Sequence, residues 1–240
     1  MSGYVHRRSL GDEGEDDYSL DITEDPSGNY VRWIAELCSP HLGPTVLDVG
    51  AGRGAITSHI VEGRTVTALE TSPSCAEFLE SRFADAPNVK VVYGDLAALD
   101  GQSYHSILLT NVLEHIHDDS GFLAELSRHL LADGSLVIYV PAINGLFTSW
   151  DRKVGHFRRY SKTRLAGVVK EAGLKVAELR YVNVLAIPAW VLSGRLVNRE
   201  AGVVRSLGVW DRFMVPATQF VESRVRLPIG LNLLCVAQIR

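Results

Sequence analysis

An apolar run that ends in alternating glycines constrains the fold of this chain more than any other feature. Residues 46–57 read VLDVGAGRGAIT, in which a buried strand would pass into a tight turn and then into a helix. Gly50 and Gly52 would let the backbone approach a ligand closely, because no Cβ stands in the way. The spacing from Gly50 to Ala55 also satisfies a dinucleotide fingerprint. The motif therefore leaves open whether the ligand is a dinucleotide or a nucleoside without phosphate.

Strand and helix patterns alternate along most of the chain. Apolar runs predict strands at 44–49, 65–70, 89–93, 106–110, 135–140, 174–182 and 230–239. Periodicity and capping residues predict helices at 28–39, 53–63, 73–84, 118–131 and 161–173. Because continuous apolar strands separated by helices are typical of parallel sheets, we expect an α/β fold with a doubly wound, mostly parallel seven-stranded sheet. Ligands of such sheets bind beyond the carboxyl ends of the strands.

The chain is expected to form one domain preceded by an arm. Its 240 residues are long enough to bury a single sizeable core. Residues 1–27 are acidic and lack periodic apolar residues, so we predict a mobile N-terminal arm. Residues 28–240 then form a single domain, with an insertion at about 183–228 before the last strand. An insertion of that length beyond a sheet edge is typical of a helical lid or a substrate pocket.

Charge is distributed unevenly along the chain. Residues 1–25 hold two basic and eight acidic residues, residues 26–150 hold six and fourteen, and residues 151–240 hold sixteen and six. The basic C-terminal part either packs beside the acidic part, so that the two fields cancel, or forms a pocket for an anionic substrate. A nucleic-acid partner is not expected, because no aromatic-rich RNA motif or recognition-helix pattern accompanies the charge.

The cysteines and the apolar segments indicate in which cellular compartment the protein is expected. Cys38, Cys75 and Cys235 are odd in number and far apart, which indicates neither a disulfide framework nor a zinc site. The most apolar later stretch, VNVLAIPAWVL, is too short to span a bilayer and contains a proline. We therefore expect a soluble, cytoplasmic protein without a transmembrane segment, present as a monomer or a homodimer.

An acidic residue argues against a dinucleotide. Asp48 lies two residues before the first glycine of the turn and would face a ligand bound there. Its carboxylate would repel a pyrophosphate placed at a helix N-terminus but would attract an amine or a sulfonium group. The turn is therefore expected to bind a cationic nucleoside, and an NAD(P)-dependent oxidoreductase is the alternative.

Four ordered motifs resemble those of class I S-adenosylmethionine-dependent methyltransferases, in the branch with ubiquinone-biosynthesis-like small-molecule enzymes. They are VLDVGAGRG, TVTALE, YGDL and TNVLEHIHDD, and each lies at the end of a predicted strand. The resemblance covers about residues 28–182. It implies the Rossmann-like methyltransferase fold, with S-adenosylmethionine as cofactor and S-adenosylhomocysteine as product. A member of this fold that does not methylate, or that serves as a binding module, is a further alternative.

The resemblance also implies roles for residues in these motifs. Asp48 matches the residue that holds the methionyl amine, and Glu70 the one that takes both ribose hydroxyls. Asp95 matches the residue that receives the adenine amino group, and the backbone of Leu96 would contact the ring. The active-site turn after the fourth strand begins at Asn111. The complete expected cofactor set is Asp48, Gly50, Ala51, Gly52, Glu70, Thr71, Asp95, Leu96 and Asn111.

Two histidines are candidates for the base that removes a proton from the acceptor. His115 follows the fourth strand, and His156 lies in the loop WDRKVGHFRRYSK after the fifth. Each imidazole can accept a proton from a hydroxyl or an amine. Alternatively, His115 only packs the turn, and the acid and arginines of the loop anchor it through structural salt bridges. Substrate contacts are expected from Asp151, Arg159, Tyr160 and Trp190.

Metal ligands are not expected in this site. The run EHIHDD contains ligand types, but Asp118 and Asp119 open the next predicted helix, where acidic residues suit the helix dipole. We therefore expect a metal-independent enzyme that acts on a small molecule: a secondary metabolite, a saccharide or a lipid-linked precursor. Oxygen is the expected acceptor atom, because histidines are available and TNVL replaces the N-P-P-Y signature of amide and base methylation.

Overall fold

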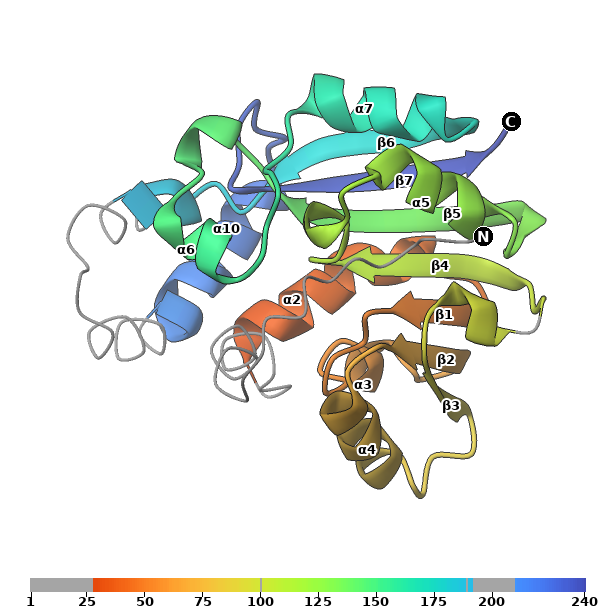
Figure 1. Cartoon of the computed structure of the whole chain (residues 1–240). Helices are drawn as coiled ribbons and strands as arrows, with labels where there is room; N and C mark the ends of the chain where they lie inside the picture. The colour runs from red at the N-terminus through yellow and green to blue at the C-terminus, as the bar shows by residue number, and fades with distance from the viewer. Residues whose placement is uncertain (1–27, 100, 189, 192–209) are drawn as a thin grey trace.

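The structure contains a seven-stranded sheet with helices on both faces (Figure 1). It is a computed structural model that describes residues 28–99, 101–188, 190–191 and 210–240. The predicted arm at 1–27 and the middle of the predicted insertion lie outside the described residues. The strands are β1 (Thr45–Val49), β2 (Thr65–Glu70), β3 (Val89–Tyr93), β4 (Tyr104–Thr110), β5 (Leu130–Pro141), β6 (Leu174–Val182) and β7 (Asn232–Ile239).

Six strands of the sheet, β1 to β6, run in the same direction. The strand order is β3-β2-β1-β4-β5-β7-β6, and β7 is antiparallel to both of its neighbours. The expected doubly wound, mostly parallel seven-stranded sheet is confirmed. Val49 lies opposite Leu69 of β2 and Leu109 of β4, so the ends of these strands are level. The turns that follow β1 to β5 consequently meet at one edge of the sheet.

Two hydrophobic layers hold the helices on the sheet. The described α-helices include α2 (Asn29–Cys38), α3 (Thr57–Ile60), α4 (Pro73–Arg82), α5 (Asp119–Ser127), α6 (Ser149–Lys153), α7 (Lys162–Glu171) and α10 (Val215–Glu222). In β1, Leu47 packs in the layer with α5 and α7, whereas Val46 packs in the layer with α2 (Figure 1). This period of two is expected for a strand buried on both faces. None of the described helices is long and apolar enough to cross a bilayer.

Two predicted helices differ from the structure. The helix expected at 53–63 is reduced to α3, because Gly54 has a φ of +79°, outside the helical range. The helix expected at 118–131 ends at Ser127, and β5 begins at Leu130. Leucines at this point fit either a helical or an alternating period, so the pattern alone did not separate the end of the helix from the start of the strand.

Part of the segment before β7 is tied to α2. Gly28 precedes α2 and has no side chain with which to cap it. The carboxylate of Asp211 takes that place and accepts hydrogen bonds from the N–H groups of Asn29 (2.9 Å) and Tyr30 (2.7 Å). A carboxylate at a helix N-terminus satisfies donors that the helix leaves open and suits the helix dipole. This contact fixes the part of the predicted insertion around Asp211 against α2.

Gly230 provides a test of the packing between β6 and β7. A Cβ at this position would lie 2.7 Å from the backbone nitrogen of Val182, which cannot move aside as a side chain can. We predict that Gly230→Ala lowers the free energy of unfolding by about 2 kcal/mol. Gly167 of α7 has open space at its Cβ position, so Gly167→Ala should raise stability by up to about 1 kcal/mol. Urea unfolding followed by circular dichroism tests the contrast, and shifts of the same sign would contradict it.

Candidate active site

The backbone donors of the glycine turn are directed at β2. The N–H groups of Gly50 and Ala51 donate to the carbonyl oxygen of Leu69, at 2.8 and 3.2 Å. The N–H group of Gly52 donates to Oε2 of Glu70 at 2.9 Å. A pyrophosphate site needs such groups to point at the ligand from a helix N-terminus. Here they are bonded within the protein, and the helix that follows is only four residues long.

The two glycines of the turn are required for different reasons. Gly50 has a φ of +68°, and a Cβ there would lie 2.8 Å from Cγ2 of Val112. Packing within the protein therefore excludes a side chain at Gly50, whereas the expected reason was close approach of the ligand. Gly52 has a φ of +57° and no atom within 4 Å of its Cβ position. Gly52 is thus the position where a ligand can approach the backbone.

Asp48 places a buried carboxylate at the end of β1. The residue is 2% exposed, and its Oδ2 accepts a hydrogen bond from the Thr57 hydroxyl at 2.6 Å. Burial raises the pKa of Asp48 to about 6; the Thr57 bond acts against this shift and the charge of Glu70 adds to it. At pH 7 the carboxylate is therefore charged in surroundings poor in water, where a bound cation would stabilise it.

Glu70 closes the glycine turn. Its Oε1 accepts hydrogen bonds from the N–H groups of Thr71 and Ser72, both at 2.8 Å, and its Oε2 accepts from Gly52. A carboxylate offers about four acceptor positions, so one on Oε2 stays available. Glu70 lies at the end of β2, as expected, with the exposed Thr71 next to it. It also fixes the backbone of the turn, a role that the sequence did not indicate.

The other expected cofactor residues follow β3 and β4. Asp95 is exposed, and its Oδ1 accepts a hydrogen bond from the N–H of Ala97 at 3.0 Å, while the neighbouring Leu96 is buried. Asn111 has a φ of +52°, and its N–H donates to the carbonyl oxygen of Tyr139 at 2.9 Å. Asparagine adopts this left-handed conformation more readily than most residues. The structure thus brings the expected cofactor set to one edge of the sheet, at the ends of β1 to β4.

Asp151 organises the loop between β5 and α7. Its Oδ2 accepts hydrogen bonds from the N–H and the hydroxyl of Thr148, which closes a capping box on α6. Its Oδ1 accepts from Nδ1 of His156 (3.0 Å) and Nε of Arg159 (2.8 Å). Burial would raise the pKa of Asp151, but these hydrogen bonds and the charge of Arg159 outweigh it and hold the pKa at about 2. The carboxylate is therefore charged, and its acceptor positions are filled.

Arg159 and Tyr160 belong to the same anchor. Arg159 is 3% exposed, pairs with Asp151, and places its guanidinium 4.3 Å from the ring centroid of Trp190. Tyr160 is fully buried, and its hydroxyl donates to Oδ2 of Asp119 at 3.0 Å. Of the two interpretations of this loop, the structural anchor fits Asp151, Arg159 and Tyr160. A contact between Trp190 and an acceptor stays a prediction.

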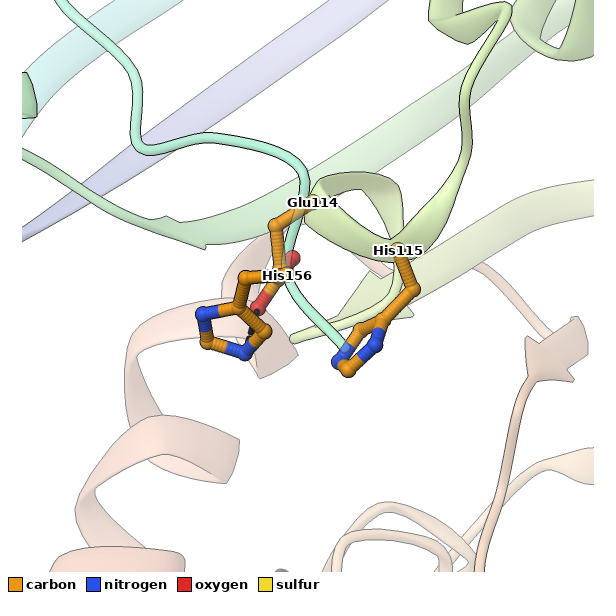
Figure 2. Close-up of side chains that lie close together, drawn as sticks. All are labelled: Glu114, His115 and His156. Carbon is orange, nitrogen blue, oxygen red and sulfur yellow. Dashed lines mark ion pairs between the residues drawn. The ribbon is translucent and has the colours of Figure 1, made fainter. Parts of the chain in front are cut away.

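His115 and His156 lie together beside this anchor (Figure 2). Their rings are arranged edge to face, with centroids 4.6 Å apart. Glu114 is fully buried between the two chain segments, and Nε2 of His156 lies 3.9 Å from its Oε1. Burial raises the pKa of Glu114 to about 8. Both candidate bases therefore share one site with a buried carboxyl group.

Residues of the run EHIHDD have two different surroundings: Asp118 and Asp119 lie at the start of α5, whereas Glu114 and His115 lie beside His156. Asp118 caps α5 by accepting a hydrogen bond from the N–H of Gly121 at 2.9 Å, and Asp119 pairs with Arg158 at 2.7 Å. These acids open the helix, as the sequence predicts. Glu114 was not among the expected site residues, although its position directly before His115 at the end of a strand was a signal that could have identified it.

Comparisons of the sequence with known proteins agree on one family. The sequence model of a family described as a methyltransferase domain matches residues 24–179. A demethylmenaquinone methyltransferase of Tropheryma whipplei (strain Twist) is 34% identical over 99 residues, which are 40% of this chain and 41% of that protein. The (S)-tetrahydroprotoberberine N-methyltransferase of Eschscholzia californica is 30% identical over 102 residues, 40% of this chain and 29% of that protein. The matched segment thus spans less than half of the length of these relatives.

Solved structures of low sequence identity share the fold. The 1,6-didemethyltoxoflavin-N1-methyltransferase of Burkholderia thailandensis, with bound 1,6-didemethyltoxoflavin and S-adenosylhomocysteine, has a TM-score of 0.59 at 19% identity, over 94% of this chain and 87% of that one. The glycopeptide N-methyltransferase MtfA, complexed with S-adenosylmethionine, has a TM-score of 0.57 at 16% identity, over 89% and 94%. The Rossmann-like methyltransferase fold expected from the sequence is confirmed.

Asp151 allows a test of the loop anchor. In Asp151→Asn the carboxamide has no charge to offset the buried guanidinium of Arg159, so we predict that the free energy of unfolding falls by about 3 kcal/mol. Asp85 carries an exposed carboxylate, and Asp85→Asn should change stability by less than about 0.5 kcal/mol. Urea titrations at neutral pH test both variants. A loss below about 1 kcal/mol for Asp151→Asn would show that the anchor is dispensable.

Proposed function

The chain belongs to the methyltransferase-domain family, and from this premise we propose that it transfers a methyl group from S-adenosylmethionine to a hydroxyl oxygen of a small molecule. One observation carries the choice of cofactor. The glycine turn presents the buried carboxylates of Asp48 and Glu70, while its own N–H donors are bonded to β2. This arrangement suits a cationic ligand and disfavours the pyrophosphate of NAD(P), which weakens the oxidoreductase alternative.

The residues at the turn fit S-adenosylmethionine. The open space at Gly52 leaves room for a ligand against the backbone. Asp48 would hold the amine of the methionine part, and the remaining acceptor position of Glu70 would take a ribose hydroxyl. Asp95 would receive the adenine amino group through its exposed carboxylate, and the backbone of Leu96 would contact the ring.

The chain has to align the acceptor and receive its proton. When bound, the cofactor supplies an electrophilic methyl carbon: the acceptor oxygen forms the new C–O bond, the electron pair of the broken S–C bond goes to sulfur, and the hydroxyl proton is released. Asp151 binds Nδ1 of His156, so Nε2 is the ring atom that faces the site. We assign proton acceptance to the pair formed by His115, on the turn after β4, and His156, in the loop after β5.

The acceptor is proposed to be a secondary metabolite, a saccharide or a lipid-linked precursor. The name of one relative, an N-methyltransferase, describes transfer to nitrogen in that protein. The preference for oxygen here rests on the two histidines and on the TNVL sequence after β4. An anionic acceptor would suit the basic residues of 151–240. A cytoplasmic location is part of the proposal, and it is supported by three cysteines that are buried as thiols.

Binding and product analysis together test the proposal. Titration of the purified chain with S-adenosylmethionine and with NAD by calorimetry should show binding of the former alone. Incubation with S-adenosylmethionine and a metabolite extract should then release S-adenosylhomocysteine, and mass spectrometry should identify the metabolite that gains one methyl group. Binding of NAD alone would overturn the cofactor assignment, and methylation of nitrogen would overturn the hydroxyl acceptor.

Asp48 gives cofactor binding a pH dependence with a defined sign. Only the charged carboxylate attracts the methionyl ammonium group, so affinity should be full above about pH 7 and should fall as the pH drops through about 6, the raised pKa of Asp48. Asp48→Asn keeps the size of the side chain and removes its charge. We predict a Kd at least about tenfold higher at neutral pH, which is the loss of one charge-assisted hydrogen bond.

Calorimetric titrations between about pH 5 and pH 8 measure this effect, and Asp48→Asn should be nearly independent of pH there. A variant that keeps the pH dependence of the unsubstituted chain would contradict the role of Asp48. Glu70→Ala should also weaken binding by about tenfold. It is a less specific probe, because Glu70 fixes the turn through three backbone hydrogen bonds.

His156 separates turnover from cofactor binding. As the proposed proton acceptor, His156 takes no part in cofactor binding, so His156→Ala should leave the Kd for S-adenosylmethionine unchanged and lower kcat by about a hundredfold. The matched control is His129→Ala, a half-buried histidine whose Nδ1 contacts the carbonyl oxygen of Gln102. Initial rates of S-adenosylhomocysteine release with the identified acceptor measure both variants. Unchanged turnover would remove His156 from the reaction.

A further inference from the structure

Three side chains with metal-ligating atoms face the same space at the edge of the sheet. Glu114 and His115 come from the turn after β4, and His156 comes from the loop after β5 (Figure 2). One ligand atom from each lies within 4.8 Å of the others. His115 is exposed, so this space is reachable from solvent, while Glu114 forms its buried wall.

The hydrogen bond to Asp151 fixes the proton of His156. Asp151 is paired with Arg159 and, as a carboxylate, can only accept, so Nδ1 of His156 is the donor in the 3.0 Å contact. The lone pair of the neutral ring therefore lies on Nε2, which faces Oε1 of Glu114 at 3.9 Å. Metal-ligating histidines commonly show this arrangement, in which a carboxylate orients the ring through the opposite nitrogen.

Glu114 is a buried acceptor without a donor. The residue is fully buried, and neither carboxyl oxygen has a hydrogen-bond partner among the described residues. A buried polar group in this state costs free energy and calls for an explanation, such as a bound ion or a catalytic role. The atom that faces Oε1 of Glu114 is the unprotonated Nε2 of His156, which has no proton to donate to it. A proton or a cation between them would relieve this contact, and the nearby ligand atom of His115 favours the cation.

We propose that Glu114, His115 and His156 bind a divalent transition-metal ion, with Zn²⁺ as the first candidate. Two imidazoles and one carboxylate are a donor set of catalytic zinc sites, and they leave a fourth position open. Zinc bonds of about 2.0–2.1 Å would place the ligand atoms roughly 3.3 Å apart, so rotation of the exposed His115 side chain completes the site. His156 lies outside the run EHIHDD, so it was not among the candidate ligands when metal binding was judged from the sequence.

The inference rests on the proposed function and names the group that activates the acceptor. A hydroxyl oxygen in the open position would release its proton to water more readily, because Zn²⁺ lowers the pKa of an oxygen bound to it by several units. The oxygen would then be the nucleophile for the methyl carbon. In this arrangement His115 and His156 hold the metal, and water replaces the histidine pair as the proton acceptor, while the cofactor and the methyl transfer of the proposed function are unchanged.

A metal titration of the full-length chain tests the site without cofactor or acceptor. The protein is freed of metal with a chelator, dialysed, and titrated with Zn²⁺ against a chromophoric chelator and with Co²⁺ by visible absorption. We expect one equivalent bound with a submicromolar Kd for Zn²⁺, and Co²⁺ bands of four-coordinate intensity. Glu114→Gln, His115→Ala and His156→Ala should each weaken binding on the order of a hundredfold.

His117→Ala is the matched control, because His117 is an exposed histidine of the same run whose ring packs on Phe157. It should keep the affinity of the unsubstituted chain. Circular dichroism separates loss of a ligand from loss of the fold, and Glu114→Gln preserves side-chain size. Absence of Zn²⁺ binding, or binding that the three ligand variants leave unchanged, would overturn the site. Titration of the metal-free protein with S-adenosylmethionine is read separately, so failure of the metal site and failure of the proposed cofactor are distinguishable.

Discussion

The parallel pairing of β1 to β5 is the constraint on which the proposed site depends. Because these strands run in one direction, the turns that follow them share an edge, although they are far apart in the chain. The register from Val49 to Leu69 and Leu109 keeps the strand ends level. Hydrophobic layers on both faces hold the sheet in place. Apolar burial elsewhere therefore positions the polar groups of the site, so some of them can keep hydrogen-bonding positions open for ligands.

Four buried carboxyl groups near this edge differ in how many donors surround them. Glu70 and Asp151 each accept several hydrogen bonds and hold a turn and a loop in shape. Asp48 accepts one from Thr57, and Glu114 has none among the described residues. A carboxylate whose acceptor positions are filled supports structure, whereas one with open positions can serve a ligand. The number of donors thus separates these roles where burial, which is similar for all four, does not.

The sequence was most informative where a pattern is local. Strands at 65–70, 89–93 and 174–182 were predicted to the residue, and at 65–70 the reason is burial on both faces, which leaves a nearly continuous apolar run. The helix predicted at 53–63 was too long, because Gly54 has a left-handed backbone and belongs to the turn, although it lies within a helical sequence pattern. Acids at strand ends were predictable from topology alone. The lack of a hydrogen-bond donor for Glu114 was not predictable. It depends on which nitrogen of His156 faces the carboxyl group, and the contact between Asp151 and His156, in a loop far along the chain, sets this orientation.

Charge at this edge favours cationic ligands at both parts of the site. The charge of Glu70 adds to the raised pKa of Asp48, and the charge of Asp151 adds to the raised pKa of Glu114. Neighbouring buried acids are costly in a medium of low dielectric constant, and positive charge reduces that cost. The sulfonium and ammonium groups of S-adenosylmethionine would supply this positive charge beside Asp48 and Glu70. The same negative edge would repel an anionic nucleophile, however, so methyl transfer to a deprotonated oxygen requires a positive charge beside the acceptor. A metal ion between Glu114 and the two histidines would place that charge where the nucleophile has to form.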